Sequence, residues 1–223
     1  MIKICLVALL VLLALEAKAD GQKLSCSESN QGAEAKFLTQ APGHAKRVSE
    51  HVLEVRYASG VKRFTDKPPF EDWDIRWMYC GYDKINQIHL IGKNNGELFT
   101  GLILFEKSGN IIQAGFEILV APNKSMYLAI EQTDGKECED WSLYEKNGHK
   151  LWSGNACIAQ RLPGANYGDI VAEFVDPNWT AQSVLVAFTQ CSDMTKKGPI
   201  YLKMQSKKWT WAPVPKCLME DNR

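Results

Sequence analysis

Carboxylates give this sequence its densest group of chemically active side chains. Four of them share the short segment of residues 134–140, namely Asp134, Glu137, Glu139 and Asp140. Two carboxylates at a suitable distance can act as acid and base in glycoside hydrolysis, and the candidates for such a pair are Glu131, Asp134, Glu137 and Asp140. Oxygen-rich loops can also hold Ca²⁺, but this segment lacks the alternate-residue spacing of a calcium loop. We therefore interpret it as a solvated or partner-facing loop.

The histidines do not form a recognisable metal motif. They are His44, His51, His89 and His149, and none has a neighbour at ligand spacing. His89 falls in an expected strand and His149 just after an expected turn, so we interpret both as wall or turn residues. The sequence also lacks G-x-S-x-G, H-E-x-x-H, C-x-x-C and a glycine-rich phosphate loop. It therefore predicts no metal site, no cofactor and no motif-based catalysis.

The first 19 residues indicate a cleaved signal peptide. Lys3 supplies a positive start, residues 4–15 are apolar, and Ala17-Lys18-Ala19 fits a cleavage pattern. The apolar run is too short for a bilayer-spanning helix, which needs about 20 residues. No later segment is comparably apolar, so we expect a periplasmic or secreted mature chain that does not insert into a membrane. Lys and Arg balance Asp and Glu at 26 each, which argues against a nucleic-acid partner.

Six cysteines remain after removal of residues 1–19, and an even number in an exported chain favours disulfides. If all six are oxidised, none can serve as a nucleophile. They are Cys26, Cys80, Cys138, Cys157, Cys191 and Cys217.

One of these pairs follows from hairpin geometry. If Asn147-Gly148 is a two-residue type I′ turn, the residue numbers of any two cross-strand partners add to 295. The numbers of Cys138 and Cys157 also add to 295, so these two cysteines would be cross-strand partners. The two sulfur atoms would then face each other within reach of a bridge. They would occupy a hydrogen-bonded position, where side chains stand further apart, and a bulge before Trp141 would correct the spacing.

The other two pairs follow by elimination. They are Cys191 with Cys217 and Cys26 with Cys80. The rival arrangement joins Cys26 to Cys217, which would tie together the two ends of a closed ring.

Short strands and tight turns must position these groups. Residues 52–57 alternate between apolar and polar and lead through a turn into residues 61–64, which predicts a hairpin. Residues 88–92 lead through the turn Asn94-Asn95-Gly96 into residues 98–106, which predicts a second hairpin. Residues 98–106 are apolar on both faces, which is typical of a strand in the interior of a sheet. Residues 112–120 alternate as one further strand. Residues 20–50 are polar and are broken at Pro42-Gly43, so we expect them to be mostly irregular, with room for a short helix.

A unit of about 40 residues occurs twice in succession. Residues 104–115 match residues 143–154 at a constant offset of 39, so Phe105 and Tyr144 should fill equivalent core positions. A looser copy follows residue 163, and the hairpin at residues 52–64 is a candidate fourth unit. Duplicated units of strands and turns are the building blocks of repeat folds.

Over residues 88–154 the pattern resembles WD-type β-propeller repeats, although the Gly-His and Trp-Asp signatures of those repeats are absent. The resemblance implies an all-β fold of antiparallel, blade-like sheets, and residues 20–223 would supply four of them as one disulfide-stabilised domain. The alternative is a two-sheet β-sandwich whose hairpins resemble each other. No function is carried over, because propellers host many.

Export, disulfides, balanced charge and missing catalytic motifs favour a non-catalytic binding protein, such as a periplasmic inhibitor or immunity-type protein that occludes a protein partner. Aromatic side chains dominate interface hot spots, although the simpler interpretation of Trp73 and Trp77 is that they close one edge of the core. The candidate partner-binding residues are Trp73, Trp77, Asp134, Glu137, Glu139 and Asp140. The alternatives are an exported hydrolase acting on cell-wall or carbohydrate substrates, and a carrier of a small ligand or metal at a propeller axis.

Overall fold

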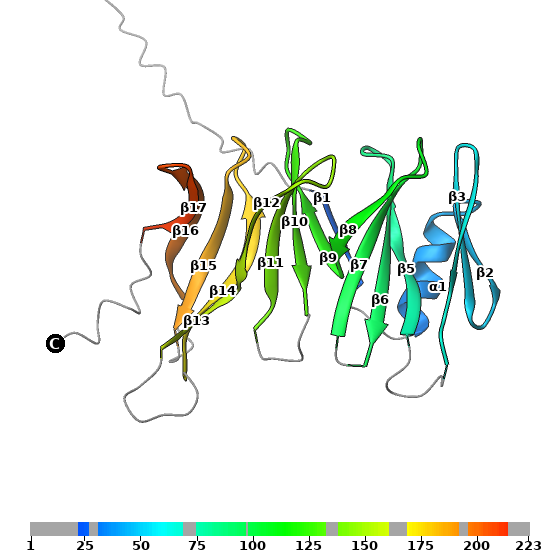
Figure 1. Cartoon of the computed structure of the whole chain (residues 1–223), viewed down its shortest axis with the longest axis horizontal. Helices are drawn as coiled ribbons and strands as arrows, with labels where there is room; N and C mark the ends of the chain where they lie inside the picture. The colour runs from blue at the N-terminus through cyan, green and yellow to red at the C-terminus, as the bar shows by residue number, and fades with distance from the viewer. Residues whose placement is uncertain are drawn as a thin grey trace, which may run out of the picture.

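Strands dominate the computed structural model of this chain (Figure 1). It describes residues 22–26, 31–68, 75–96, 98–132, 138–160, 169–191 and 196–213. The predictions for residues 1–19, Trp73, Asp134, Glu137 and Cys217 lie outside these ranges. No helix within them is both long and apolar enough to span a bilayer.

The first two sheets are antiparallel and follow chain order. The first consists of β2 (Ala45–Ser49), β3 (Val52–Tyr57) and β4 (Gly60–Thr65). Helix α1 (Gln31–Gln40) precedes it in the chain and packs on the first strand of the second sheet. The second consists of β5 (Ile75–Asp83), β6 (Ile88–Asn95), β7 (Leu98–Phe105) and β8 (Ile111–Gly115). The β3–β4 hairpin and the β6–β7 hairpin are both confirmed as predicted from their turns and alternation.

The last two sheets have five strands each. The third has the order β1 (Gln22–Ser25), β9 (Glu117–Val120), β10 (Met126–Glu131), β11 (Asp140–Glu145) and β12 (Lys150–Asn155). The fourth has the order β13 (Cys157–Gln160), β14 (Asp169–Trp179), β15 (Leu185–Cys191), β16 (Lys196–Gln205) and β17 (Lys208–Ala212).

The four sheets stack face to face in a row, with a hydrophobic layer between each neighbouring pair (Figure 1). The two middle sheets are therefore buried on both faces. In β7, for example, Ile103 packs towards the third sheet and Leu104 towards the first, and both are fully buried. This confirms the expectation that residues 98–106 lie in a sheet interior, because such a strand must be apolar on both faces.

The predicted fold class is confirmed: the protein is all-β, its sheets are antiparallel, and disulfides bridge the chain. A propeller closes its ring by packing the first blade on the last. Within the described ranges, the first and fourth sheets lie at opposite ends of the row instead (Figure 1). A closed ring is therefore not seen.

The prediction that residues 20–50 are mostly irregular was wrong. They contain β1, α1 and β2. Strand β1 adds to the edge of β9, and α1 buries Phe37 and Leu38 against the layer between the first two sheets. These elements are stabilised by partners distant in sequence, and short-range periodicity cannot reveal such partners.

Residues 112–120 also differ from the prediction, because they form two strands in two sheets. The chain leaves the second sheet after Gly115 and enters the third at Glu117. Between them, the carbonyl of Phe116 accepts a hydrogen bond from the backbone N–H of Cys26 at 2.7 Å. The alternation of apolar residues continues through the break, so periodicity alone reads the two strands as one.

The disulfides join Cys26 to Cys80 and Cys138 to Cys157, as predicted. Cys191 is also disulfide-bonded, and its predicted partner lies outside the described residues. Disulfides of this kind are typical of proteins in oxidising compartments.

The hairpin that brings Cys138 and Cys157 together has the predicted strand register, but its turn differs from the predicted one. Glu145 donates its N–H to the carbonyl of His149, so the loop has three residues and not two. A bulge between Leu143 and Tyr144 then restores partners whose numbers add to 295. The bulge expected before Trp141 lies nearer the turn.

Phe105 and Tyr144 do not occupy equivalent core positions. Both pack into the layer between the second and third sheets, and they approach it from opposite sides. Because side chains alternate along a strand, a one-residue difference in structural register reverses the face that a repeated residue presents.

Candidate functional site

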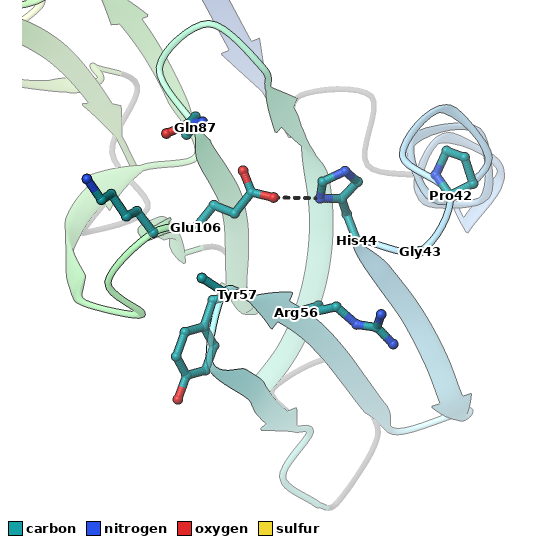
Figure 2. Close-up of a pocket in the computed structure, with 9 residues that line it drawn as sticks. Pro42, Gly43, His44, Arg56, Tyr57, Gln87 and Glu106 are labelled. Carbon is teal, nitrogen blue, oxygen red and sulfur yellow. Dashed lines mark ion pairs between the residues drawn. The ribbon is translucent and has the colours of Figure 1, made fainter.

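A pocket of about 750 Å³ opens between the first and second sheets (Figure 2). Its polar lining comes from four separate segments: the residues before β2, the end of β3, the β5–β6 turn and the residues after β7. The side chains involved are His44, Arg56, Tyr57, Gln87, Glu106 and Lys107.

Backbone hydrogen bonds fix the two central residues of this pocket. After α1, the chain turns through Gly43 with a φ of +80°, a left-handed conformation that glycine adopts without strain. The carbonyl of His44 then accepts the N–H of Arg56 at 2.7 Å. Glu106 is held on both sides, since its N–H donates to Gln87 and its carbonyl accepts the N–H of Ala58. The pocket is therefore built on tethered backbone.

The side chains of His44 and Glu106 meet in the lining of the pocket (Figure 2). Nδ1 of His44 lies 3.3 Å from Oε1 of Glu106. The other carboxylate oxygen accepts a hydrogen bond from the hydroxyl of Tyr82, whose ring stacks on His44 at 4.3 Å between centroids. Burial, together with this hydrogen bond, raises the pKa of Tyr82 to about 12, so the phenol remains a donor at neutral pH.

His89, on β6, lies directly behind this pair and is fully buried. Its ring stacks on Tyr82 at 4.7 Å, and its Nδ1 lies 3.0 Å from the hydroxyl oxygen of Tyr79. Burial, assisted by nearby His44, lowers the pKa of His89 to about 4. The imidazole is therefore neutral at pH 7.

Together, His44, His89 and Glu106 form a compact group that we call the His–His–Glu cluster. Each offers one ligand atom, and these atoms all lie within 4.8 Å of one another. Sequence spacing could not reveal the cluster, because its members come from the residue before β2, from β6 and from the residue after β7. The only local signal is a histidine in the otherwise apolar run Ile88-His89-Leu90-Ile91.

Three of the residues expected to bind a partner are described, Trp77, Glu139 and Asp140, and these three do not gather into one surface. Trp77 is half-buried on β5, where its ring packs against Phe64 at 5.3 Å and beneath the ammonium of Lys93. This contact closes the edge of the first core layer. Asp140, by contrast, lies in the third sheet and accepts a hydrogen bond from Asn155 at 3.1 Å.

Glu139 also points into the structure. Its carboxylate accepts the indole N–H of Trp141 at 3.1 Å, and burial raises its pKa despite that hydrogen bond.

The structure does bring two of the candidate catalytic carboxylates together. Glu131 and Asp140 are direct partners across β10 and β11, so they lie on the same face of the sheet. Glu131 is buried and accepts a hydrogen bond from Gln113 at 2.7 Å. Burial nevertheless raises its pKa.

Comparison with known proteins adds no family to this description: the chain matches no protein-family model, no curated protein and no solved structure. The class of protein must therefore be argued from the fold and the pocket.

Proposed function

We propose that this chain is an exported, non-catalytic binding protein that holds a small polar ligand in the pocket between its first two sheets. The observation that carries the proposal is the convergence of His44, Glu106 and Tyr82 at a pocket whose backbone is tethered on both sides. A concave site with a few convergent polar groups and titratable residues of perturbed pKa is a typical ligand site. The disulfides give it a constrained scaffold.

The pocket's charges suggest the chemistry of the ligand. Arg56 and Lys107 bring two cationic side chains to the lining, whereas Glu106 is its only described carboxylate and is already engaged by His44 and Tyr82. The ligand class that suits this balance is a small molecule with an anionic group, such as a carboxylate or phosphate, because a guanidinium can bind either through two hydrogen bonds.

This can be tested on protein purified from its native source under non-denaturing conditions. Mass spectrometry of the material released on unfolding should identify one small anionic compound bound to the wild type. Arg56→Gln should weaken the affinity for this compound at least about tenfold, and so lower its occupancy, because one charge-assisted hydrogen bond is worth roughly 1.5–3 kcal/mol.

The matched control is Arg63→Gln. Arg63 lies on the neighbouring strand but pairs with Glu54 and does not line the pocket. Equal occupancy in the two variants, or no bound compound in the wild type, would count against the proposal.

A form of the same proposal in which the protein occludes a partner, as an inhibitor or immunity-type protein, has less support. Trp77, Glu139 and Asp140 make internal contacts and are divided between two sheets. Affinity capture from the native envelope fraction would test it, and the expected result is one stoichiometric protein partner.

The proposal also includes the signal peptide and the propeller-like arrangement of the sheets. Residues 1–19 are a signal peptide, which N-terminal sequencing of the exported protein would test. The four sheets are propeller-like blades set in an open row, and not the two sheets of a sandwich. This is supported by their order along the chain and by the packing of each sheet on the next.

A second candidate function is hydrolysis of a cell-wall or carbohydrate substrate by Glu131 and Asp140. It is favoured by their direct pairing and by the raised pKa of Glu131, which suits a general acid. Turnover of glycan or muropeptide substrates that is lost in Glu131→Gln but retained in Glu145→Gln, an exposed carboxyl on the same sheet, would establish it.

Glu131→Gln also has an expected effect on stability. Because the pKa of Glu131 is higher in the folded than in the unfolded chain, the folded chain binds more protons and loses stability as pH rises from about 4.5 through the folded pKa. Glutamine removes this loss and preserves the contact with Gln113. The variant should therefore gain stability relative to the wild type over that pH range. Urea unfolding at several pH values measures this, and a difference independent of pH would contradict it.

A further inference from the structure

We propose that the His–His–Glu cluster binds one zinc-class divalent transition-metal ion, with an open coordination position that faces the pocket. This rests on the proposed function, because it identifies the group in the pocket that holds the ligand. The ion would be bound by His44, His89 and Glu106.

The donor atoms are already close to the spacing that a metal requires. Ligands about 2.0–2.2 Å from a tetrahedral zinc ion lie about 3.3–3.6 Å from one another. Nδ1 of His44 and Oε1 of Glu106 are 3.3 Å apart, and the ligand atoms of all three residues fall within 4.8 Å. Small side-chain rotations would suffice to place three donors on one ion.

His89 supplies the second, independent observation. Its Nε2 atom is buried and has no hydrogen-bond partner among the described residues. A buried polar atom left without a partner costs free energy, and native proteins seldom keep one without a reason. A metal ion at the cluster would give this nitrogen the partner that it lacks.

The surrounding hydrogen bonds are those of a metal site. Histidine ligands usually donate the other ring N–H to an oxygen, which fixes the tautomer. Nδ1 of His89 lies 3.0 Å from the hydroxyl oxygen of Tyr79, so its N–H can donate to that oxygen and leave the lone pair of Nε2 free. Tyr82 orients Glu106 in the same way, because its hydroxyl donates a hydrogen bond to the carboxylate oxygen that does not face His44.

The donor set selects the class of metal. Two imidazole nitrogens and one carboxylate oxygen suit zinc and its neighbours, whereas Ca²⁺ and Mg²⁺ prefer oxygen ligands. Three protein donors leave the fourth tetrahedral position open. Because His44 and Glu106 line the pocket, that position faces it, and an anionic pocket ligand could complete the coordination.

The test uses the full mature chain without a histidine tag, stripped of metal by a chelator and then titrated with Zn²⁺ alone. Isothermal titration and elemental analysis should give one zinc ion per chain. Loss of a ligand in His44→Ala or Glu106→Gln should weaken binding at least about a hundredfold, and loss of the supporting hydroxyl in Tyr79→Phe about tenfold to a hundredfold. Co²⁺ in place of Zn²⁺ should give the visible absorption of a four-coordinate site in the wild type, and this absorption should be lost in His44→Ala and Glu106→Gln.

The matched control is His149→Ala. His149 forms a surface pair with Glu145, 3.7 Å away, which lies apart from the cluster. This variant should bind zinc as tightly as the wild type. His44 and Glu106 are partly exposed, so their variants should fold, and thermal unfolding without metal confirms it. The proposal is overturned if wild-type chain binds no stoichiometric zinc, or if His44→Ala and His149→Ala bind equally.

Failure of this inference can be told apart from failure of the proposed function. If metal-stripped protein retains its small ligand, and loses it in Arg56→Gln, but shows no zinc site, the metal inference alone is overturned. If zinc binds as expected but no small anionic compound accompanies the native protein, the proposed small-ligand function fails and the metal site remains.

Discussion

Gly115→Ala is expected to lower the free energy of unfolding by about 4 kcal/mol or more. The added methyl group would clash with backbone atoms that no side-chain rotation can move away. An added Cβ would lie 1.8 Å from the carbonyl oxygen of Ile130, and 2.4 Å and 2.5 Å from the carbon and nitrogen of the same residue. Clashes with a flexible side chain can be relieved by rotation. This clash is with the backbone of β10, which is fixed within the third sheet.

The affected contact joins the second and third sheets. Next to it, Phe99 and Gln132 exchange backbone hydrogen bonds of 2.7 Å and 2.8 Å between the same two sheets. Moving β8 away from β10 would strain this bridge as well as open the hydrophobic layer between the sheets. Since folded domains are stable by only about 5–15 kcal/mol, the variant should be largely unfolded in mild denaturant.

Urea unfolding followed by circular dichroism measures the effect. The control is Gly198→Ala on β16, where an added Cβ meets nothing within 4 Å in the described structure. That change should alter stability by no more than about 0.5 kcal/mol. A loss of less than about 1 kcal/mol in Gly115→Ala would mean that β8 and β10 do not approach each other as described.

Removing the Cys26–Cys80 disulfide is the second change with a large expected effect. The bridge spans 54 residues of sequence, so the loop-entropy relation gives about 4 kcal/mol of stabilisation, against about 3 kcal/mol for the 19-residue span of Cys138–Cys157. Both sulfur atoms are buried and pack over Gly92 in the layer between the second and third sheets. The double variant Cys26→Ala with Cys80→Ala should therefore be less stable than Cys138→Ala with Cys157→Ala.

Both double variants can be compared with the wild type by urea unfolding at one pH. A reductant should lower the stability of the wild type and have less effect on either variant, which has one bridge fewer to lose. An equal or greater loss on removing the shorter-loop pair would contradict the expected order.

Local patterns predicted a substantial part of the fold. The two-faced apolar run at residues 98–106 placed β7 inside a sheet, and the glycine turns placed the β3–β4 and β6–β7 hairpins. These succeeded because the alternation of side chains and the tolerance of glycine for tight turns are properties of neighbouring residues. The Cys138–Cys157 pair was also found, although its turn was one residue longer and a bulge compensated.

Patterns failed where an element depends on a distant partner. Strand β1 exists because the edge of β9 is available, and the chain divides between β8 and β9 because two sheets meet there. Neither event changes the local alternation of residues. The literal 39-residue repeat likewise failed to give equivalent positions for Phe105 and Tyr144, since packing decides which face of a strand meets which layer.

The sequence by itself determined that this protein is a set of antiparallel strands with tight turns and paired cysteines. Only the tertiary structure decided that the sheets stack in an open row, and that His44, His89 and Glu106 meet beside a pocket. The physical reason is the distance along the sequence over which each feature is decided. Strand and turn preferences depend on residues a few positions apart. The three members of the cluster are far apart in sequence, so they meet only after distant strands have packed.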